Sequence, residues 1–310
     1  MADLQRLFDL ADPRVRKIWD EKNSQISQRL EYQNLGYNDQ NAEIQDTRIE
    51  NFTGLGLASL TGEKQPYASE EIDQGGNVTI TPQKWTKAVD ISEEMLRFNL
   101  WPKINNLVGA ASNSLNQRID TEAAKLFYLG FGTTFQSGPD SLALFSGAHT
   151  RTSASGTQSN TTTNTLSYEN LKTAVQAVDR FSDDKDVQLL PARQLCLVVA
   201  REKKERALEV LRSIGNPDNA QRVSNVFQMQ GEGTIQLVVA NYIPVTTYSN
   251  YWFLVDKERA NMMLHMLWGW RPRFDSDNAI NNGTKIYTGS TMFKPGFSAW
   301  QFAYGSSATS

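Results

Sequence analysis

A glycine- and acid-rich segment between two strand-like stretches constrains this chain most. Residues 53–76 read TGLGLASLTGEKQPYASEEIDQGG, and IQDTRIENF precedes them while NVTITPQKWTKAVDI follows. The flanks alternate roughly between apolar and polar residues, which is typical of strands. We therefore predict one long two-stranded hairpin over residues 46–91. A lone hairpin of this length has almost no core of its own and is marginal in water, so another subunit should stabilise it.

The first 45 residues are polar and rich in Gln and Asn. Apolar residues at helical spacing predict a short first helix, which Pro13 should end. Segment 19–44 has few large apolar residues, so we expect an arm that lies on another surface or stays disordered.

A long amphipathic helix is predicted after the hairpin. Ser92 with Glu93 and Glu94 is a good helix start, because acidic groups suit the positive end of a helix. After an interruption at Trp101-Pro102, apolar residues recur at helical spacing over about residues 104–129, and Gly130 follows them. One apolar face indicates a helix that lies along a sheet or a subunit groove.

The second half of the chain alternates between helices and apolar strands. A helix should begin at Ser167, and QLCLVV, TIQLVVANYIP and YWFLV read as strands. REKKERALEVLRSI reads as a helix whose charge run is a solvated face. We predict an α+β protein with a mixed sheet in this half.

The charge and cysteine content exclude several classes of protein. There are 31 basic and 34 acidic residues, so the net charge of −3 argues against a surface that grips nucleic acid over its whole extent. Cys196 is the only cysteine, so no intramolecular disulfide forms. The N-terminus lacks the apolar region of a secretory signal, and no stretch approaches the roughly 18 apolar residues that span a bilayer. We expect a soluble protein, made inside a cell, with no membrane partner.

The sequence offers little for catalysis. Its two histidines are His149 and His265. Ser146 precedes His149 in LFSGAHT, but the surroundings do not match the Gly-x-Ser-x-Gly turn of hydrolases, so a hydrogen-bonded structural histidine is the better interpretation. Asp275 and Asp277 have the spacing that opens a calcium loop, yet the required glycine and closing glutamate are missing. We predict a non-enzyme with no cofactor and no metal.

The order of these elements resembles the tailed-phage major capsid proteins of the Hong Kong 97 type, over roughly residues 46–304. The segment GPDSLALFSGAHT is similar to the one that follows the long helix in the Mu-like major head subunit family. The residues that carry this similarity are Asp140, Leu144, Phe145, Ser146 and His149.

The resemblance implies a division of the chain and a set of subunit contacts. The implied parts are an N-terminal arm (1–45), an E-loop hairpin (46–91), a peripheral domain with the spine helix and a Thr/Ser loop (92–166), an axial domain (167–270), and closing strands that return to the peripheral domain (271–310). Because exposed aromatic residues on a hairpin without a core need a partner, we expect Phe52, Tyr67 and Trp85 to contact a neighbouring subunit, with Lys64 at the tip. No motif supports a lysine–asparagine crosslink.

The same resemblance implies the partners and the location. The chain would form hexamers and pentamers of an icosahedral shell, assembled in the host cytoplasm and found in the virion. A separate scaffolding protein, a portal and decoration proteins are the implied partners, and packaged DNA would be touched without sequence reading.

Three alternatives remain open at the level of sequence. An encapsulin-like nanocompartment shares the fold and would hold an enzyme cargo instead of DNA. A phage tail or baseplate structural protein is disfavoured by the long helix and the mixed second half. A hydrolase would depend on Ser146 and His149.

Overall fold

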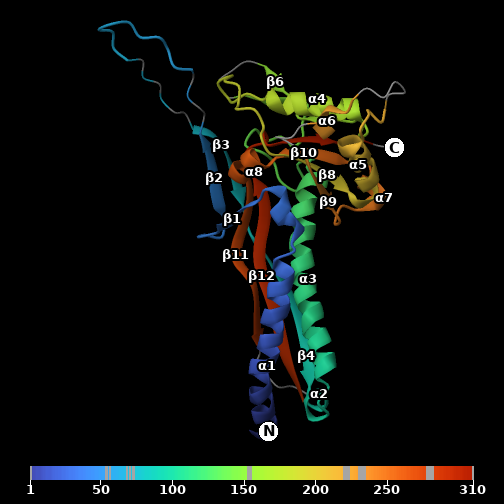
Figure 1. The fold of residues 1–310 in the computed structure, drawn as a ribbon. Coiled ribbons are helices and arrows are strands. Elements are labelled where there is room, and N and C mark those ends of the chain that lie inside the picture. The colour runs from blue at the N-terminus through green and yellow to red at the C-terminus, as the bar shows by residue number, and fades with distance from the viewer. Residues whose placement is uncertain are drawn as a thin grey trace.

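The computed structural model describes residues 2–52, 55, 57–67, 69, 71, 74–151, 156–218, 224–229, 235–276 and 283–308. These residues form a narrow stem and a broader head, and a long loop projects outward beside the head, beyond β2 and β3 (Figure 1). The N-terminus lies at the far end of the stem, whereas the C-terminus lies at the head.

The stem is a sheet with helices on one face. Its elements are α1 (Ala2–Ser27), η1 (Glu31–Leu35), β1 (Asn38–Asn41), β4 (Gln83–Ser92), α2 (Glu93–Arg97), α3 (Trp101–Tyr128), β11 (Leu264–Ser276) and β12 (Thr284–Phe297). The strand order is β1-β11-β12-β4, with β1 parallel to β11 and the other pairs antiparallel. Helices α1 and α3 run along this sheet, and their apolar residues share one core with its strands (Figure 1).

The long helix predicted from apolar spacing is confirmed as α3. Ile104, Val108, Leu115 and Ile119 are all buried, as the periodic pattern indicates. The helix start predicted at Ser92 belongs to the short α2, where the Ser92 hydroxyl accepts the Met95 N–H at 3.4 Å. A sharp turn then leads into α3.

The prediction that Pro13 ends the first helix is wrong, because α1 continues through it to Ser27. Phe8 and Val15 lie on either side of the proline and are fully buried, and Trp19 stacks on Phe274 with ring centroids 4.6 Å apart. A proline inside a helix costs about 3 kcal/mol, and the burial of these large apolar side chains offsets that cost.

The expectation that segment 19–44 cannot bury itself is also wrong. Leu30, Tyr32, Leu35 and Tyr37 are buried in the same core as the head strands. These apolar residues are few, but they are large enough to anchor the segment in the core. In addition, the Tyr37 hydroxyl donates to the Ala123 carbonyl of α3 at 2.9 Å.

The head contains a five-stranded mixed sheet in the order β7-β13-β10-β8-β9. Its elements are β7 (Thr161–Thr162), α4 (Tyr168–Asp179), β8 (Leu195–Ala200), η2 (Arg201–Lys203), α5 (Lys204–Arg212), α6 (Val226–Met229), β9 (Gln236–Ala240), α7 (Val245–Tyr248), β10 (Trp252–Asp256), α8 (Lys257–Met263) and β13 (Ala303–Ser306). Strand β8 pairs parallel to β9 and antiparallel to β10. The predicted α+β class with a mixed sheet in the second half is confirmed.

The hairpin is shorter than predicted. Strand β2 (Thr47–Phe52) pairs with β3 (Gln74–Ile80), whereas β4 pairs with β12 in the stem sheet. Pro82 separates β3 from β4, and it cannot donate to a continuous ladder of hydrogen bonds. Val78 and Ile80 pack on Leu267 of β11, so among the described hairpin residues a core within the chain forms at the base alone.

Two short strands lie outside the main sheets, and two predicted domain boundaries differ from the structure. Strands β5 (His149–Thr150) and β6 (Thr157–Gln158) pair beside the head. The boundary expected at residue 270 falls inside β11, and β13 joins the head sheet instead of returning to the stem. The sheet to which β11 and β13 belong is decided by the strands they pair with, and sequence periodicity does not reveal those partners.

No helix in the described part of the chain is long and apolar enough to cross a membrane.

Candidate subunit-contact sites

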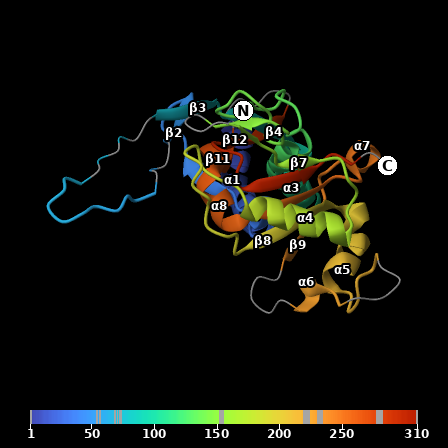
Figure 2. The same cartoon turned by 90° about the horizontal axis from the view of Figure 1, so that it is seen from above.

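The loop between β2 and β3 presents large apolar side chains to solvent. Leu57 is 84% exposed, Leu60 101% and Tyr67 90%. Seen from above, the loop extends away from both stem and head (Figure 2). Burying one such side chain gains about 1.5–3 kcal/mol, so this surface favours contact with another molecule.

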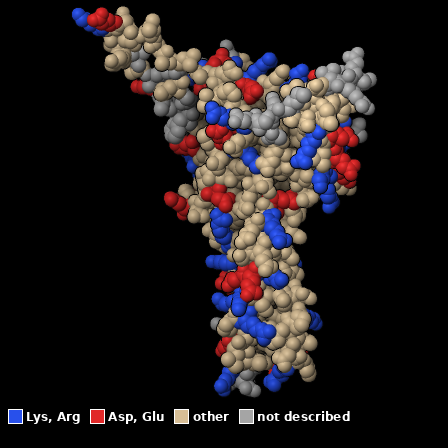
Figure 3. All heavy atoms as spheres, viewed as in Figure 1, with Lys and Arg blue, Asp and Glu red and all other residues tan. Residues whose placement is uncertain are grey.

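The predicted contact residues fall into two groups. Lys64 lies in an exposed turn with φ 67°, and Tyr67 follows it on the same loop. The backbone of Phe52 ends β2, but its side chain lies outside the described residues. Acidic and basic side chains lie together at the far end of the loop (Figure 3). The roles of Phe52, Lys64 and Tyr67 in subunit contact remain predictions.

Trp85 is not part of the hairpin, because β4 places it in the stem sheet. The Arg118 guanidinium of α3 lies 3.7 Å from the centroid of its ring, which is a cation–π contact. Arg118 Nη2 and Lys125 Nζ approach Glu122 Oε1 at 2.6 and 2.8 Å. Trp85 therefore forms one wall of a charged site on the stem.

This site is a cavity of about 330 Å³, which we call the stem pocket. Its lining includes Arg118, Lys125 and Lys294 but only one carboxylate, that of Glu122. Trp85 Nε1 and Arg118 Nε are buried donors that find no acceptor among the described residues. The surplus positive charge suits an anion from outside. Sequence reasoning missed Arg118 and Glu122, whose i,i+4 spacing on α3 was the available signal.

His149 and Ser146 do not form a catalytic pair. His149 Nδ1 lies 2.6 Å from Asp140 Oδ2, and its Nε2 lies 3.2 Å from Asn160 Oδ1. The Ser146 hydroxyl accepts the Ala148 N–H at 3.3 Å. The prediction of a hydrogen-bonded structural histidine is confirmed.

His265 is a buried histidine of β11. Its Nε2 lies 3.0 Å from the Ser298 hydroxyl, and its Nδ1 has no partner among the described residues. Burial lowers the pKa of His265 to about 4, so the ring is neutral at physiological pH.

Of Asp275 and Asp277, which have the spacing of a calcium-binding loop, the structure describes Asp275. Asp275 Oδ2 lies 3.4 Å from Arg273 Nε, while Asp277 lies outside the described residues. Within the described part of the chain, no group of three or more His, Cys, Asp or Glu side chains could hold a metal ion.

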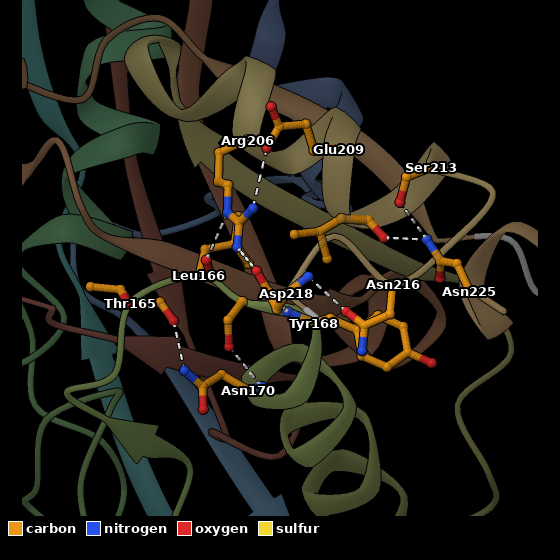
Figure 4. A network of polar contacts seen from close by, with 12 residues as sticks. Thr165, Leu166, Tyr168, Asn170, Arg206, Glu209, Ser213, Asn216, Asp218 and Asn225 are labelled. Atoms are coloured by element: carbon orange, nitrogen blue, oxygen red, sulfur yellow. Dashed lines mark hydrogen bonds and ion pairs between the residues drawn. The ribbon is translucent and has the colours of Figure 1, made fainter. Parts of the chain in front are cut away.

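A polar network fixes the exposed edge of the head (Figure 4). Arg206 of α5 pairs with Asp218 and, at 3.2 Å, with Glu209. Asp218 Oδ2 accepts the Tyr168 N–H at the start of α4 at 2.7 Å. Although burial opposes it, this amide and the Arg206 guanidinium hold the pKa of Asp218 below its usual value. The network ties α4 and α5 to the chain that precedes residues 219–223, which are not described.

Comparison with known proteins identifies the family. A family model described as phage capsid protein matches residues 76–304. In contrast, no curated protein matches the chain.

Solved structures share the fold at low identity. The capsid of an empty GTA particle is 12% identical, with 91% of this chain and 90% of that chain covered and a TM-score of 0.55. The mature capsid of bacteriophage PhiM1 is 11% identical, with coverage of 88% and 85% and a TM-score of 0.55. A virus-like particle from Pyrococcus furiosus is 9% identical, with coverage of 95% and 98% and a TM-score of 0.54.

The family match covers well over half of the chain, from β3 to β13. It favours neither the nanocompartment nor the tail and baseplate alternatives. The solved structures place the same residues in the Hong Kong 97 type of capsid fold. The chain therefore belongs to the phage capsid protein family, and it is a major capsid protein of the Hong Kong 97 fold.

Proposed function

We propose that this capsid protein assembles into pentamers and hexamers of an icosahedral shell that encloses double-stranded DNA. The observation that carries the proposal is the loop between β2 and β3, on which Leu57, Leu60 and Tyr67 lie exposed beyond any core of their own chain. Such a surface becomes stable when a second copy covers it. Contacts between different patches of identical subunits close into rings, as a shell requires.

The stem pocket is the surface that would receive the loop of the neighbouring copy. The loop carries the exposed Glu63 and Glu71, whereas the pocket has an excess of cations. The partly exposed ammonium groups of Lys125 and Lys294 are the groups with which an incoming carboxylate would pair. Phe52, Lys64, Tyr67 and Trp85 remain our assigned contact residues.

The remaining parts of the chain take the roles that the resemblance implies. Helix α3 is the spine of the peripheral domain, and the head elements from α4 to α8 supply the axial domain. The similarity of residues 138–150 to the Mu-like major head subunits supports assignment of the chain to that subfamily. A separate scaffolding protein, a portal and decoration proteins take part in assembly in the host cytoplasm, and the protein has no catalytic activity.

DNA would be held as cargo without sequence reading. Basic and acidic side chains both occur along the face of the stem in Figure 3, and the net charge of the chain is −3. A surface of mixed sign gives weak, salt-dependent contact with phosphates, which suits a genome that must leave the shell.

The test removes the apolar character of the loop. Leu57→Ser, Leu60→Ser and Tyr67→Ser are combined in one variant, and assembly is followed by electron microscopy and sedimentation. We expect the circular dichroism spectrum and the unfolding midpoint of the unassembled chain to be unchanged, because these side chains touch no core. Closed particles should be reduced at least about tenfold, since each lost contact removes about 1.5–3 kcal/mol.

Leu190→Ser is the matched control, because Leu190 is 84% exposed but lies on the head. Normal assembly of the loop variant would refute the role of the loop. Particles that contain an enzyme in place of DNA would refute the DNA-enclosing function and favour a nanocompartment.

A further inference from the structure

Strand β4 leaves one edge of the stem sheet open. It pairs with β12 on one side, and no described strand lies against its other side. Thr86, Lys87 and Ala88 are exposed in succession, although neighbouring side chains of a strand point to opposite faces. Exposure on both faces at once is expected where the edge itself is uncovered. The backbone groups of β4 that point away from β12 therefore face solvent.

The open edge of β4 is long and regular. All ten of its residues pair with β12 in one continuous register, whereas the pairing of β11 with β12 shifts twice. Soluble proteins usually protect an edge with a bulge, a proline, a short strand or a covering segment, because a long regular edge pairs readily with a free strand. The opposite edge of the same sheet is the four-residue β1, which is short in this way. Strand β4 therefore has the form of a receiving edge.

The loop between β2 and β3 offers a matching stretch of free backbone. Residues 57–60 are all exposed, and they belong to no helix, strand or turn. Their backbone groups make no hydrogen bond to another described residue. Each of these groups can form one regular hydrogen bond in a sheet. Pro66 removes a donor from the returning half of the loop, so the outgoing half, which contains residues 57–60, is the better strand.

Charge favours the pairing of this stretch with β4. Lys84 and Lys87 lie exposed on β4, and the stem pocket, whose lining includes Lys294, adjoins the start of the strand at Trp85. The loop carries the exposed Glu63 just after residues 57–60. Basic side chains on an edge repel a basic strand but attract one that carries a carboxylate. The edge and the loop are therefore complementary in charge as well as in free backbone groups.

We propose that residues 57–60 of one copy pair, strand to strand, with the open edge of β4 in a second copy. The loop points away from the stem of its own chain, so the edge that it meets belongs to another copy (Figures 1 and 2). Such pairing rests on the proposed function, in which copies form a shell, and it adds backbone hydrogen bonds to the apolar contacts of the loop. When a strand is added to an open edge, the backbone bonds supply affinity and the side chains supply specificity.

Hydrogen exchange along β4 tests the pairing in the unmutated chain. Alternate residues of an antiparallel strand bond to opposite sides, so every second amide of β4 should exchange fast in the unassembled chain. In particles these same amides should exchange at least about tenfold more slowly, because each gains a partner. Unchanged exchange along β4 in particles would overturn the pairing and leave the shell itself standing. Absence of particles would contradict the proposed function, and the pairing with it.

Two proline variants of the loop test the backbone bonds specifically, and each is the matched control of the other. Ala58→Pro and Ser59→Pro remove one amide hydrogen each, from neighbouring residues whose amides point to opposite sides of a strand. An edge strand accepts proline where the missing N–H would face away from its partner.

We expect one variant to lose the slow exchange on β4 and to form at least about tenfold fewer particles, because one hydrogen bond is missing from every such contact. The other variant should behave as the unmutated chain. Neither should change the unfolding midpoint of the unassembled chain, since residues 57–60 make no backbone hydrogen bond to another described residue there. Equal behaviour of the two variants would show that the loop does not pair through its backbone, and would overturn the proposal.

Discussion

The ammonium group of Lys285 lies 2.6 Å from the carboxylate of Asp12, although the two residues are 273 positions apart. Lys285 is 2% exposed on β12, and Asp12 lies on α1 one residue before Pro13. The Tyr287 hydroxyl donates to the same carboxylate. This buried pair sets the position of α1 along the stem sheet, since a shifted helix would leave Lys285 buried without its partner.

Asp12→Ala should therefore destabilise the chain strongly. We expect the free energy of unfolding, measured with urea on the unassembled chain, to fall by about 3 kcal/mol, because a buried cation loses its partner. Asp20→Ala removes an exposed carboxylate from the same helix and should change it by less than about 0.5 kcal/mol. Asp12→Leu with Lys285→Met should recover most of the loss. Equal stability of Asp12→Ala and the unmutated chain would show that α1 is not held by this pair.

The buried carboxyl group of Asp120 should make the free energy of unfolding depend on pH. It is 5% exposed on α3, and it accepts the Tyr32 N–H at 3.1 Å. Burial raises its pKa from 3.8 to about 6, although the amides of Tyr32 and Glu31 oppose the shift. In this window the folded chain holds a proton that the unfolded chain has released, so the free energy of unfolding falls as the pH rises.

Asp120→Asn should remove this slope and keep an oxygen for the Tyr32 amide. We expect the variant to be more stable at neutral pH by on the order of 1–2 kcal/mol. Urea unfolding at a series of pH values measures both effects. An unchanged slope would show that Asp120 does not titrate in this window.

His265 should act in the opposite direction. Its folded-state pKa of about 4 lies below the ordinary value of 6.5. The unfolded chain therefore takes up a proton first as the pH falls through this window, and the free energy of unfolding decreases. His265→Gln should flatten this acid-side loss, whereas Asp120→Asn should steepen it by removing the opposing term. Identical pH profiles of the two variants would contradict both assignments.

The ion pair between Arg206 and Asp218 should stabilise the adjoining part of the head. Asp218→Ala removes the acceptor of the Tyr168 amide and the partner of Arg206, so we expect a loss of about 1–2 kcal/mol. Hydrogen exchange at the Tyr168 amide should become faster, while that at the Trp252 amide in β10 should change little. Asp186→Ala breaks an exposed ion pair and should cost less than about 1 kcal/mol. Unaltered exchange at Tyr168 would show that Asp218 does not hold the start of α4.

Local patterns predicted the elements whose residues carry their own signal. The apolar spacing that ends near Gly130 identified α3, and the unbroken run LCLVV identified β8. In both cases the period and the burial of neighbouring residues agree, so no distant partner is needed to recognise the element.

Long-range partners account for what was missed. Nothing near Pro13 in the sequence reveals that Lys285 of β12 and Phe274 of β11 contact α1. The continuation of α1 through the proline was therefore not predictable. The LFSGAHT stretch was assigned correctly to a structural role, but Asn160 and Trp300, which contact the His149 ring, are separated from it by loops and by half the chain. The stem pocket was missed because Trp85 was assigned to the hairpin.

Electron microscopy of the purified chain, alone and with its neighbouring gene products, tests the central claim most directly. We predict closed icosahedral shells, or rings of five and six subunits. A monomer that never assembles, under any condition of salt or scaffolding protein, would contradict the account.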